Sequence, residues 1–201
     1  MPRSETMTAI ADSMKKAAAA FREHDIPFML AGSLASWARG GPETSHDLDF
    51  VVKPGDAERA LEALEAAGMK TERPPENWLY KAWDGDVLID VIFQPSGLAL
   101  DDPLFERAES ISVLSMDLPV MGLEDVVVTK LNALTEHSLE GYEGLLDMAR
   151  ALREQIDWEQ VRARTKGLPF ADAYFVMLDG LGIVTEPEQP DPRVRVDVST
   201  A

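Results

Sequence analysis

The chain has 201 residues, of which 45% are hydrophobic, and it carries a formal net charge of −17 with no cysteine. This length and composition suffice for one domain with a sizeable core, and they exclude a disulfide framework and a thiolate zinc site. The balance of 36 acidic against 19 basic residues disfavours general binding to nucleic-acid backbones, although a local basic face for a short RNA end stays open.

The sequence also lacks recognisable targeting and metal-binding patterns. Its N-terminal segment carries charges throughout, and no run approaches the roughly 18 apolar residues of a membrane helix. The three histidines, His24, His46 and His137, are too scattered to suggest a ligand cluster. We therefore expect a cytoplasmic protein that does not enter a membrane.

Hydrophobic periodicity predicts alternating helices and strands in the first half of the chain. Ser33 is expected to cap a short helix that Gly40, Gly41 and Pro42 stop, and Gly68 is expected to end the next helix. In chain order we predict a helix over 6–23, a strand over 26–32, a helix over 33–39, a strand over 47–52, a helix over 56–67 and a hairpin of strands 78–83 and 87–93 around Asp84-Gly85.

The second half becomes helical after residue 122. We predict a short helix over 103–109, strands over 111–116 and 118–122, and helices over 123–137, 142–155, 157–165 and 169–182. The proline-rich tail is expected to be poorly ordered or to dock at the periphery. These patterns predict an α/β (α+β) fold with a short mixed sheet flanked by helices. They divide the chain into a core over 1–121, a C-terminal helical region over 122–184 and a tail over 185–201.

Three aspartates lie in the predicted strands. Asp47 and Asp49 are two residues apart and therefore project from the same face of one strand, where their oxygens can converge on a cation. Asp90 interrupts the apolar run VLIDVIF, in which an uncompensated carboxylate costs several kcal/mol. If the two strands are neighbours, all three carboxylates face one site. The alternative is that an arginine neutralises Asp90, or that it lies exposed at the end of the sheet.

The Gly32-Ser33 pair is the second chemical signal. Glycine allows close approach of the backbone, and a serine at a helix N-terminus adds a hydroxyl beside unpaired N–H groups, so such a corner can receive phosphate. By itself this pair is typical of an ordinary helix cap. In combination with the three aspartates, the pair favours a corner that holds phosphate over an ordinary helix cap.

In their order and spacing, Gly32-Ser33, Asp47-x-Asp49 and Asp90 resemble the signature of the DNA polymerase β-like nucleotidyltransferase superfamily, over about residues 26–93. The helical half, including EDVVVTKLNAL and LLDMARAL, is similar to small bacterial nucleotidyltransferases of the antibiotic-modifying and abortive-infection toxin types. An isolated Asp-x-Asp would equally suggest a metal-dependent glycosyltransferase.

The resemblance implies a magnesium-dependent enzyme that transfers a nucleoside monophosphate from an NTP such as ATP to an acceptor hydroxyl, with release of pyrophosphate. Asp47 and Asp49 would hold two Mg²⁺ ions, and Asp90 would join one metal or act as the base. Gly32 and Ser33 would receive the nucleotide phosphates.

Other residues give weaker signals. Lys130 lies near an apolar helical stripe, so it either points inward at a triphosphate or extends to solvent. Arg39 is placed to reach a phosphate from the first short helix, unless it is simply solvated. Asp147 falls on the polar side of its helix and is expected at the surface. Lys81 and the aromatic residues around it either line an acceptor pocket or pack across the hairpin.

The acceptor is the least defined part of the prediction. Basic residues are spread along the chain, with Arg162, Arg164 and Lys166 as the main cluster, so a small hydroxylated molecule or a protein is favoured over the 3′ end of tRNA. A catalytically silent binding or regulatory relative with a partner protein is the alternative class, and the intact set of three aspartates argues against it.

Overall fold

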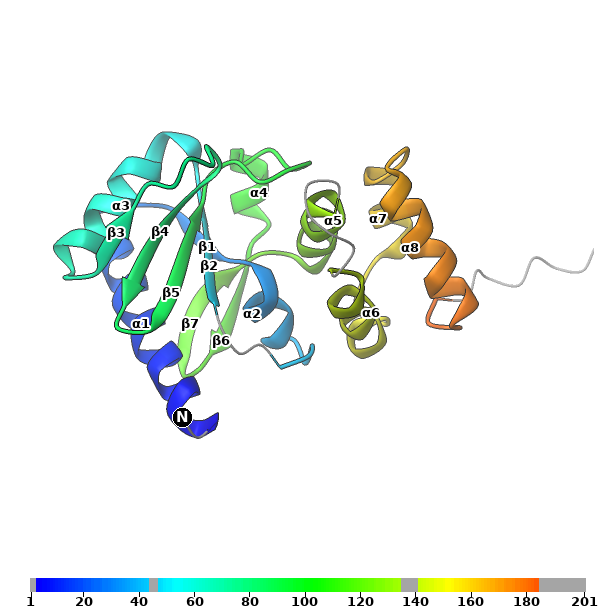
Figure 1. The fold of residues 1–201 in the computed structure, drawn as a ribbon, viewed down its shortest axis with the longest axis horizontal. Coiled ribbons are helices and arrows are strands. Elements are labelled where there is room, and N and C mark those ends of the chain that lie inside the picture. The colour runs from blue at the N-terminus through cyan, green and yellow to red at the C-terminus, as the bar shows by residue number, and fades with distance from the viewer. Residues whose placement is uncertain (1–2, 44–46, 135–140, 185–201) are drawn as a thin grey trace, which may run out of the picture.

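The computed structural model describes residues 3–43, 47–134 and 141–184, and Figure 1 shows a sheet flanked by helices with a helical half beside it. Within these residues seven strands form one mixed sheet in the order β3-β4-β5-β2-β1-β7-β6. The strands are β1 (Phe28–Leu30), β2 (Asp47–Val52), β3 (Lys70–Glu72), β4 (Leu79–Asp84), β5 (Val87–Ile92), β6 (Glu109–Val113) and β7 (Met116–Val120). The helices are α1 (Arg3–Glu23), α2 (Gly32–Trp37), α3 (Ala57–Ala66), α4 (Asp102–Glu106), α5 (Leu123–Ala133), α6 (Gly141–Leu152), α7 (Trp158–Arg164) and α8 (Pro169–Gly180), with a 3₁₀ turn η1 (Pro54–Asp56). The predicted fold class is confirmed.

The central strands β2 and β5 each have one apolar and one polar face, because side chains alternate along a strand. They pair in parallel, with Leu48 opposite Ile89 and Phe50 opposite Val91. These four side chains are buried, and Phe21 of α1 packs edge-on against Phe50 with ring centroids 5.5 Å apart. Helices α1 and α3 cover this face (Figure 1). A slip of one residue would turn the apolar set away from the helices, so the core fixes the register.

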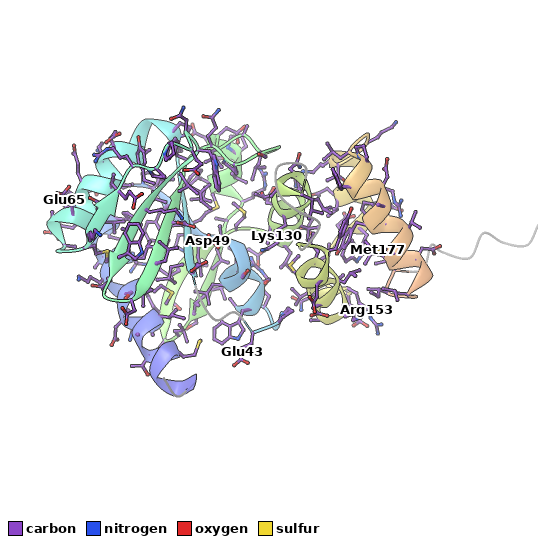
Figure 2. The ribbon with its side chains drawn as sticks, viewed as in Figure 1. Glu43, Asp49, Glu65, Lys130, Arg153 and Met177 are labelled. Atoms are coloured by element: carbon purple, nitrogen blue, oxygen red, sulfur yellow. The ribbon has the colours of Figure 1, made fainter. Side chains whose placement is uncertain are left out.

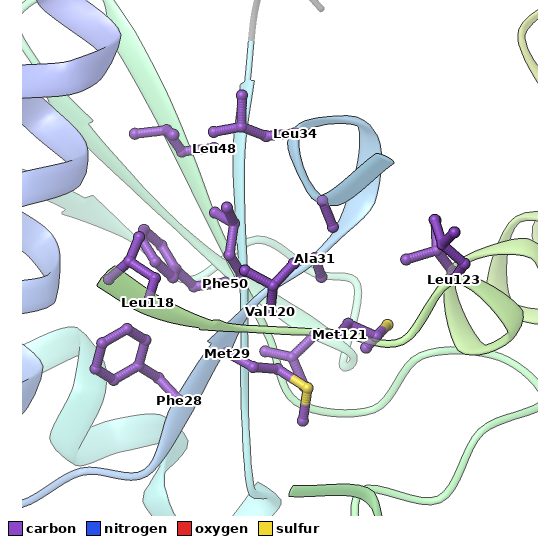
Figure 3. Close-up of a cluster of buried hydrophobic side chains, with 14 of the residues drawn as sticks. Phe28, Met29, Ala31, Leu34, Leu48, Phe50, Leu118, Val120, Met121 and Leu123 are labelled. Carbon is purple, nitrogen blue, oxygen red and sulfur yellow. The ribbon is translucent and has the colours of Figure 1, made fainter. Parts of the chain in front are cut away.

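Strand β1 is buried on both faces and joins the two parts of the sheet. It pairs antiparallel with β2 and parallel with β7. Figure 3 shows Phe28 and Met29 on β1 with Leu118 and Val120 on β7, in the cluster that continues to Leu123 at the start of α5. The core therefore reaches without interruption from the sheet into the helical half.

The second hairpin differs from its prediction. Strands were expected over 111–116 and 118–122, but the chain turns at Leu114 and Ser115, whose φ angles are 49° and 67°. Two positive φ values in a two-residue loop are typical of a hairpin turn that usually selects Asn or Gly. Leucine gives no such signal, so the apolar pattern alone places the turn wrongly.

Other boundaries also move. Strand β3 was not predicted, because its sequence KTE is polar and its pairing with β4 alone makes it a strand. The strand predicted over 26–32 ends at Leu30, since Gly32 already opens α2. The predicted tail lies outside the described residues, and the division at residue 122 stays a prediction. No helix among the described residues has the length and apolarity needed to cross a membrane.

A buried carboxylate links the sheet side of the molecule to the helical half. Asp125 of α5 is 3% exposed and accepts hydrogen bonds from Arg107, which follows α4, at 2.9 and 3.0 Å. Arg164, at the end of α7, donates to the same carboxylate at 2.6 Å. Such charge-assisted bonds are stronger than neutral ones, and they satisfy a charge that would be costly to bury alone.

We expect Asp125→Asn to lower the free energy of unfolding by about 2–4 kcal/mol, because it removes the charge that two arginines share. Urea unfolding followed by circular dichroism measures the change. Asp147→Asn is the matched control, since Asp147 is half exposed and pairs only locally with Arg150 at 3.0 Å; its effect should stay within about 0.5 kcal/mol. Equal effects of the two variants would contradict a structural role for Asp125.

Candidate functional site

Three aspartates lie on the polar face of the central strands. Asp49 of β2 is directly opposite Asp90 of β5 in the parallel ladder, and Asp47 is two residues before Asp49. Register partners project to the same side of a sheet, as do residues two apart on a strand, so the three carboxylates share one face. Asp47 is exposed, whereas Asp49 and Asp90 are half-buried. We call these residues the acid triad.

Lys81 extends this arrangement to β4. It is opposite Asp90 in the antiparallel hairpin, and its Nζ donates to Asp90 Oδ1 at 3.1 Å. The cation beside Asp90 is therefore a lysine on the neighbouring strand, and this corrects the predicted alternative of an arginine or an exposed sheet end. The neighbouring Tyr80 packs against Phe93 with ring centroids 4.7 Å apart, as expected for cross-strand packing.

The Gly32-Ser33 corner contacts the acid triad directly. Gly32 has a φ of +60°, and a Cβ at this position would lie 1.8 Å from Asp49 Oδ2, so only glycine fits. The backbone N–H of Ser33 lowers the pKa of the Asp49 carboxylate. The expectation that Ser33 is the helix cap is wrong, because Ala31 occupies that position and Ser33 lies inside α2.

Lys130 of α5 reaches the same corner from the helical half. Its Nζ donates to the Ser33 hydroxyl at 3.3 Å, so this lysine points inward, as one of the two predicted alternatives required. Figure 2 labels Asp49 and Lys130 where the sheet meets the C-terminal helices. The arrangement places a cation beside the carboxylates at the position where a polyanion could approach them.

The surroundings disfavour ionisation of the buried carboxylates. Burial, the largest cause, raises the pKa of Asp49 to about 6. The charges of Asp90 and Asp47 raise it further, while Lys130 and the Ser33 N–H lower it. Burial also raises the pKa of Asp90, against the lowering effect of Lys81. A bound cation would relieve this repulsion and stabilise the ionised forms.

A pocket of about 480 Å³ opens beside Ser33 and Lys130. Helices α2, α5 and α6 supply most of its wall. Its lining residues are Ser33, Ser36, Pro42, Glu43, Lys130, Ala133, Leu134, Gly141, Gly144, Leu145 and Met148. The wall is thus largely apolar, with the lysine and two serines near the sheet, which suits a ligand that has an apolar body and an anionic end.

Arg39 and Asp147 contact residues outside the acid triad and the pocket. The guanidinium of Arg39 donates to the Ala35 carbonyl at 3.0 Å and lies 3.3 Å from Glu109 on β6, with its side chain only 7% exposed. This placement gives no support to the predicted contact between Arg39 and a phosphate. Asp147 is exposed on α6, as predicted.

The acid triad has the chemistry of a site for a hard divalent ion. Mg²⁺ prefers carboxylate oxygens, and three of them share one face where their mutual repulsion is already felt. Across the described residues, however, no group of three or more histidine, cysteine or acidic side chains is already gathered closely enough to hold a metal. The residue types and their shared face fit Mg²⁺.

The hairpin predicted around Asp84-Gly85 has its turn one residue too early, and this register does not set Lys81 opposite Asp90. Asp84 pairs with Val87, so the turn is Gly85-Asp86, and counting back from it sets Lys81 opposite Asp90. The correct turn would therefore have revealed the pair. The contribution of α6 to the pocket had no comparable signal, because it depends on how distant helices pack.

The chain is similar to known proteins in sequence and in fold. The sequence model of a family described as "Uncharacterised nucleotidyltransferase" matches residues 4–180. No curated protein matches the sequence. Among solved structures, the solution structure of the antibiotic-resistance factor ANT(2″)-Ia has a TM-score of 0.60 and 17% identity, covering 87% of this chain and 98% of that chain.

Two further structures are similar. The crystal structure of ANT(2″)-Ia in complex with adenylyl-2″-tobramycin has a TM-score of 0.59 and 16% identity, covering 82% of this chain and 98% of that chain. A putative nucleotidyltransferase from Thermotoga maritima has a TM-score of 0.49 and 15% identity, covering 77% of this chain and 94% of that chain. The likeness to ANT(2″)-Ia shows a shared fold.

The raised pKa of Asp49 predicts a pH-dependent stability. A carboxyl whose pKa is higher in the folded state binds its proton more tightly there, so its ionisation costs stability as the pH rises from about 4 to about 6. In buffer without divalent ions, Asp49→Asn should gain up to about 3 kcal/mol relative to the wild type between pH 4 and pH 7. Urea unfolding of the wild type and of Asp49→Asn at both pH values measures the change. A constant difference for Asp49→Asn would contradict the raised pKa.

Proposed function

The chain belongs to the family of uncharacterised nucleotidyltransferases, and we propose that it transfers a nucleoside monophosphate from an NTP to a hydroxyl of a small acceptor in the presence of Mg²⁺. The observation that carries the proposal is the register of β2 and β5, which sets Asp49 opposite Asp90 beside the Gly32-Ser33 corner. The family match favours an enzyme over a silent binding relative.

In the proposed reaction the acceptor oxygen attacks the α-phosphorus of the NTP. A bond forms between that oxygen and phosphorus, the bond from the α-phosphorus to the bridging oxygen breaks, and pyrophosphate leaves with the electron pair. The acceptor proton passes to Asp90 or, where Asp90 is a metal ligand, to solvent; burial holds the pKa of Asp90 above its ordinary value, which favours proton uptake. Such reactions depend mainly on positioning and on neutralising charge.

The acid triad would hold Mg²⁺, with Asp47 and Asp49 as the ligands of two ions and Asp90 joining one of them. When bound, the ions neutralise the phosphate oxygens and align the reacting groups. Lys130 and the Ser33 hydroxyl, already in contact at 3.3 Å, would receive the phosphates of the NTP. Glycine at position 32 keeps the backbone close enough to Asp49 for these groups to act on one ligand.

The pocket beside Lys130 is the proposed place for the nucleoside. Its apolar wall would hold the base, and its opening at Ser33 and Lys130 would lead the phosphates toward the acid triad. The polar face of β4 and β5 then remains for the acceptor. The complex of ANT(2″)-Ia with adenylyl-2″-tobramycin supports a small hydroxylated acceptor as the first class to test.

A transfer assay tests the proposed function. The purified chain is incubated with each of the four NTPs labelled at the α-phosphate, with Mg²⁺ and, separately, with hydroxylated antibiotics including tobramycin, other small hydroxylated molecules, total tRNA and a protein extract. We expect label on a small molecule, a loss of at least about 100-fold in Asp49→Asn, and full activity in Asp147→Asn. Label on tRNA alone, or on protein alone, would show that the acceptor is that macromolecule and not a small molecule. Label on none of them, or equal activity in Asp49→Asn, would refute the proposal.

The pocket assignment predicts the effect of filling it. The added Cβ at Gly144, which lines the pocket on α6, meets no atom within 4 Å, so a larger side chain can enter the space without backbone clash. We expect Gly144→Phe to raise the KM for NTP at least about tenfold by excluding the base. Gly180→Phe is the control, because Gly180 at the end of α8 is equally open but does not line this pocket. An unchanged KM in Gly144→Phe would show that the nucleoside does not bind in this pocket.

A further inference from the structure

Lys81, Asp90 and Asp49 lie in one row across three adjacent strands. Lys81 of β4 is the antiparallel partner of Asp90, and Asp90 of β5 is the parallel partner of Asp49 on β2. Direct partners project to the same face in both kinds of ladder, so the row lies on the face of the acid triad. Backbone pairing on both sides therefore holds the lysine beside the carboxylates.

The lysine already supplies Asp90 with a positive charge. Its Nζ is 3.1 Å from Asp90 Oδ1, and the two side chains are only 29% and 16% exposed. Desolvation at this depth disfavours a bare carboxylate, and a neighbouring ammonium offsets part of that cost. Asp90 would also be a ligand if the acid triad held a divalent ion, so the lysine and the ion would share this carboxylate.

We propose that Lys81 is a built-in counter-ion that competes with the divalent ion for Asp90, and thereby sets the ion concentration at which the acid triad is filled. The proposal rests on the proposed function, because it takes the acid triad as the metal site. An ammonium group and a divalent ion repel one another at a separation of a few ångströms, so the ion must displace the lysine from Asp90. Lys81 is thus a positioning residue that acts through Asp90.

Lys130 has a different place in the same site. Its Nζ contacts the Ser33 hydroxyl, on the side of Asp49 where the pocket opens. It can meet an arriving phosphate without leaving a carboxylate, whereas Lys81 must give up its ion pair with Asp90. The two lysines are therefore expected to have opposite effects on ligand binding. Lys130 favours the site with phosphate bound, and Lys81 favours the site without the divalent ion.

Binding of Mn²⁺ alone tests this proposal without any turnover. Free Mn²⁺ is titrated by electron paramagnetic resonance against the full chain, in the absence of nucleotide, at one pH and one ionic strength. Lys81→Met keeps the length of the side chain and removes its charge, and we expect it to bind Mn²⁺ about tenfold more tightly than the wild type. Lys81→Gln is a second variant without the charge and should shift the affinity in the same direction.

Lys16→Met is the matched control. Lys16 of α1 also forms a lysine–aspartate pair with the hairpin, with its Nζ 2.5 Å from Asp84 Oδ1, but Asp84 is not in the acid triad. This variant also removes one positive charge, so it makes the net charge of the protein more negative by the same amount, and it should leave Mn²⁺ affinity unchanged. An equal gain in Lys16→Met would show that overall charge, and not competition at Asp90, is responsible, and would overturn the proposal.

The remaining outcomes separate this proposal from the proposed function. Mn²⁺ binding that Asp49→Asn abolishes, but that Lys81→Met and Lys81→Gln leave unchanged or weaken, overturns the role of Lys81 alone. Absence of Mn²⁺ binding in the wild type and in both Lys81 variants overturns the metal site and the counter-ion together. Nucleotide transfer measured separately then decides whether the enzyme assignment stands.

Thermal unfolding gives a second measurement that does not need a fully stable variant. Without Mn²⁺, Lys81→Met should have a lower Tm than the wild type because Asp90 loses its partner. Added Mn²⁺ should raise the Tm of Lys81→Met by more than it raises that of the wild type, since the ion replaces the missing charge. An equal rise in both proteins would overturn the proposal.

Discussion

The parallel pairing of β2 with β5 is the constraint on which the site depends. It sets Asp49 opposite Asp90 on one face, while the same register buries Leu48 against Ile89 on the other. Side chains alternate with a period of two, so the position of the carboxylates and the packing of the core cannot be changed independently. The apolar face under α1 and α3 therefore determines where the acid triad is displayed.

The site is held in an electrostatically unfavourable state. Burial and neighbouring carboxylates raise the pKa of Asp49 to about 6, and burial raises that of Asp90. Lys81, Lys130 and the Ser33 N–H offset part of this cost from three separate elements. Groups with perturbed pKa values are common at functional sites. A ligand of opposite charge stabilises the ionised carboxylates more fully than the surrounding protein does.

Helix α5 couples the sheet to the helical half. Its first turn provides Asp125, which two arginines from α7 and the segment after α4 contact. Its last turn provides Lys130, which reaches the Gly32-Ser33 corner and lines the pocket that α6 completes. A change in the packing of these helices would therefore move the proposed phosphate contact and the nucleoside pocket together.

The sequence by itself determined the features that depend on local periodicity: most helices and strands, the shared face of Asp47 and Asp49, and the close backbone that Gly32 permits. Only the tertiary structure decided which distant segments meet. It made β5 the neighbour of β2, brought Lys130 to Ser33 and turned Arg39 toward Glu109. Periodicity reports which face of a segment is buried, but the partner that buries it is selected by packing of the whole chain.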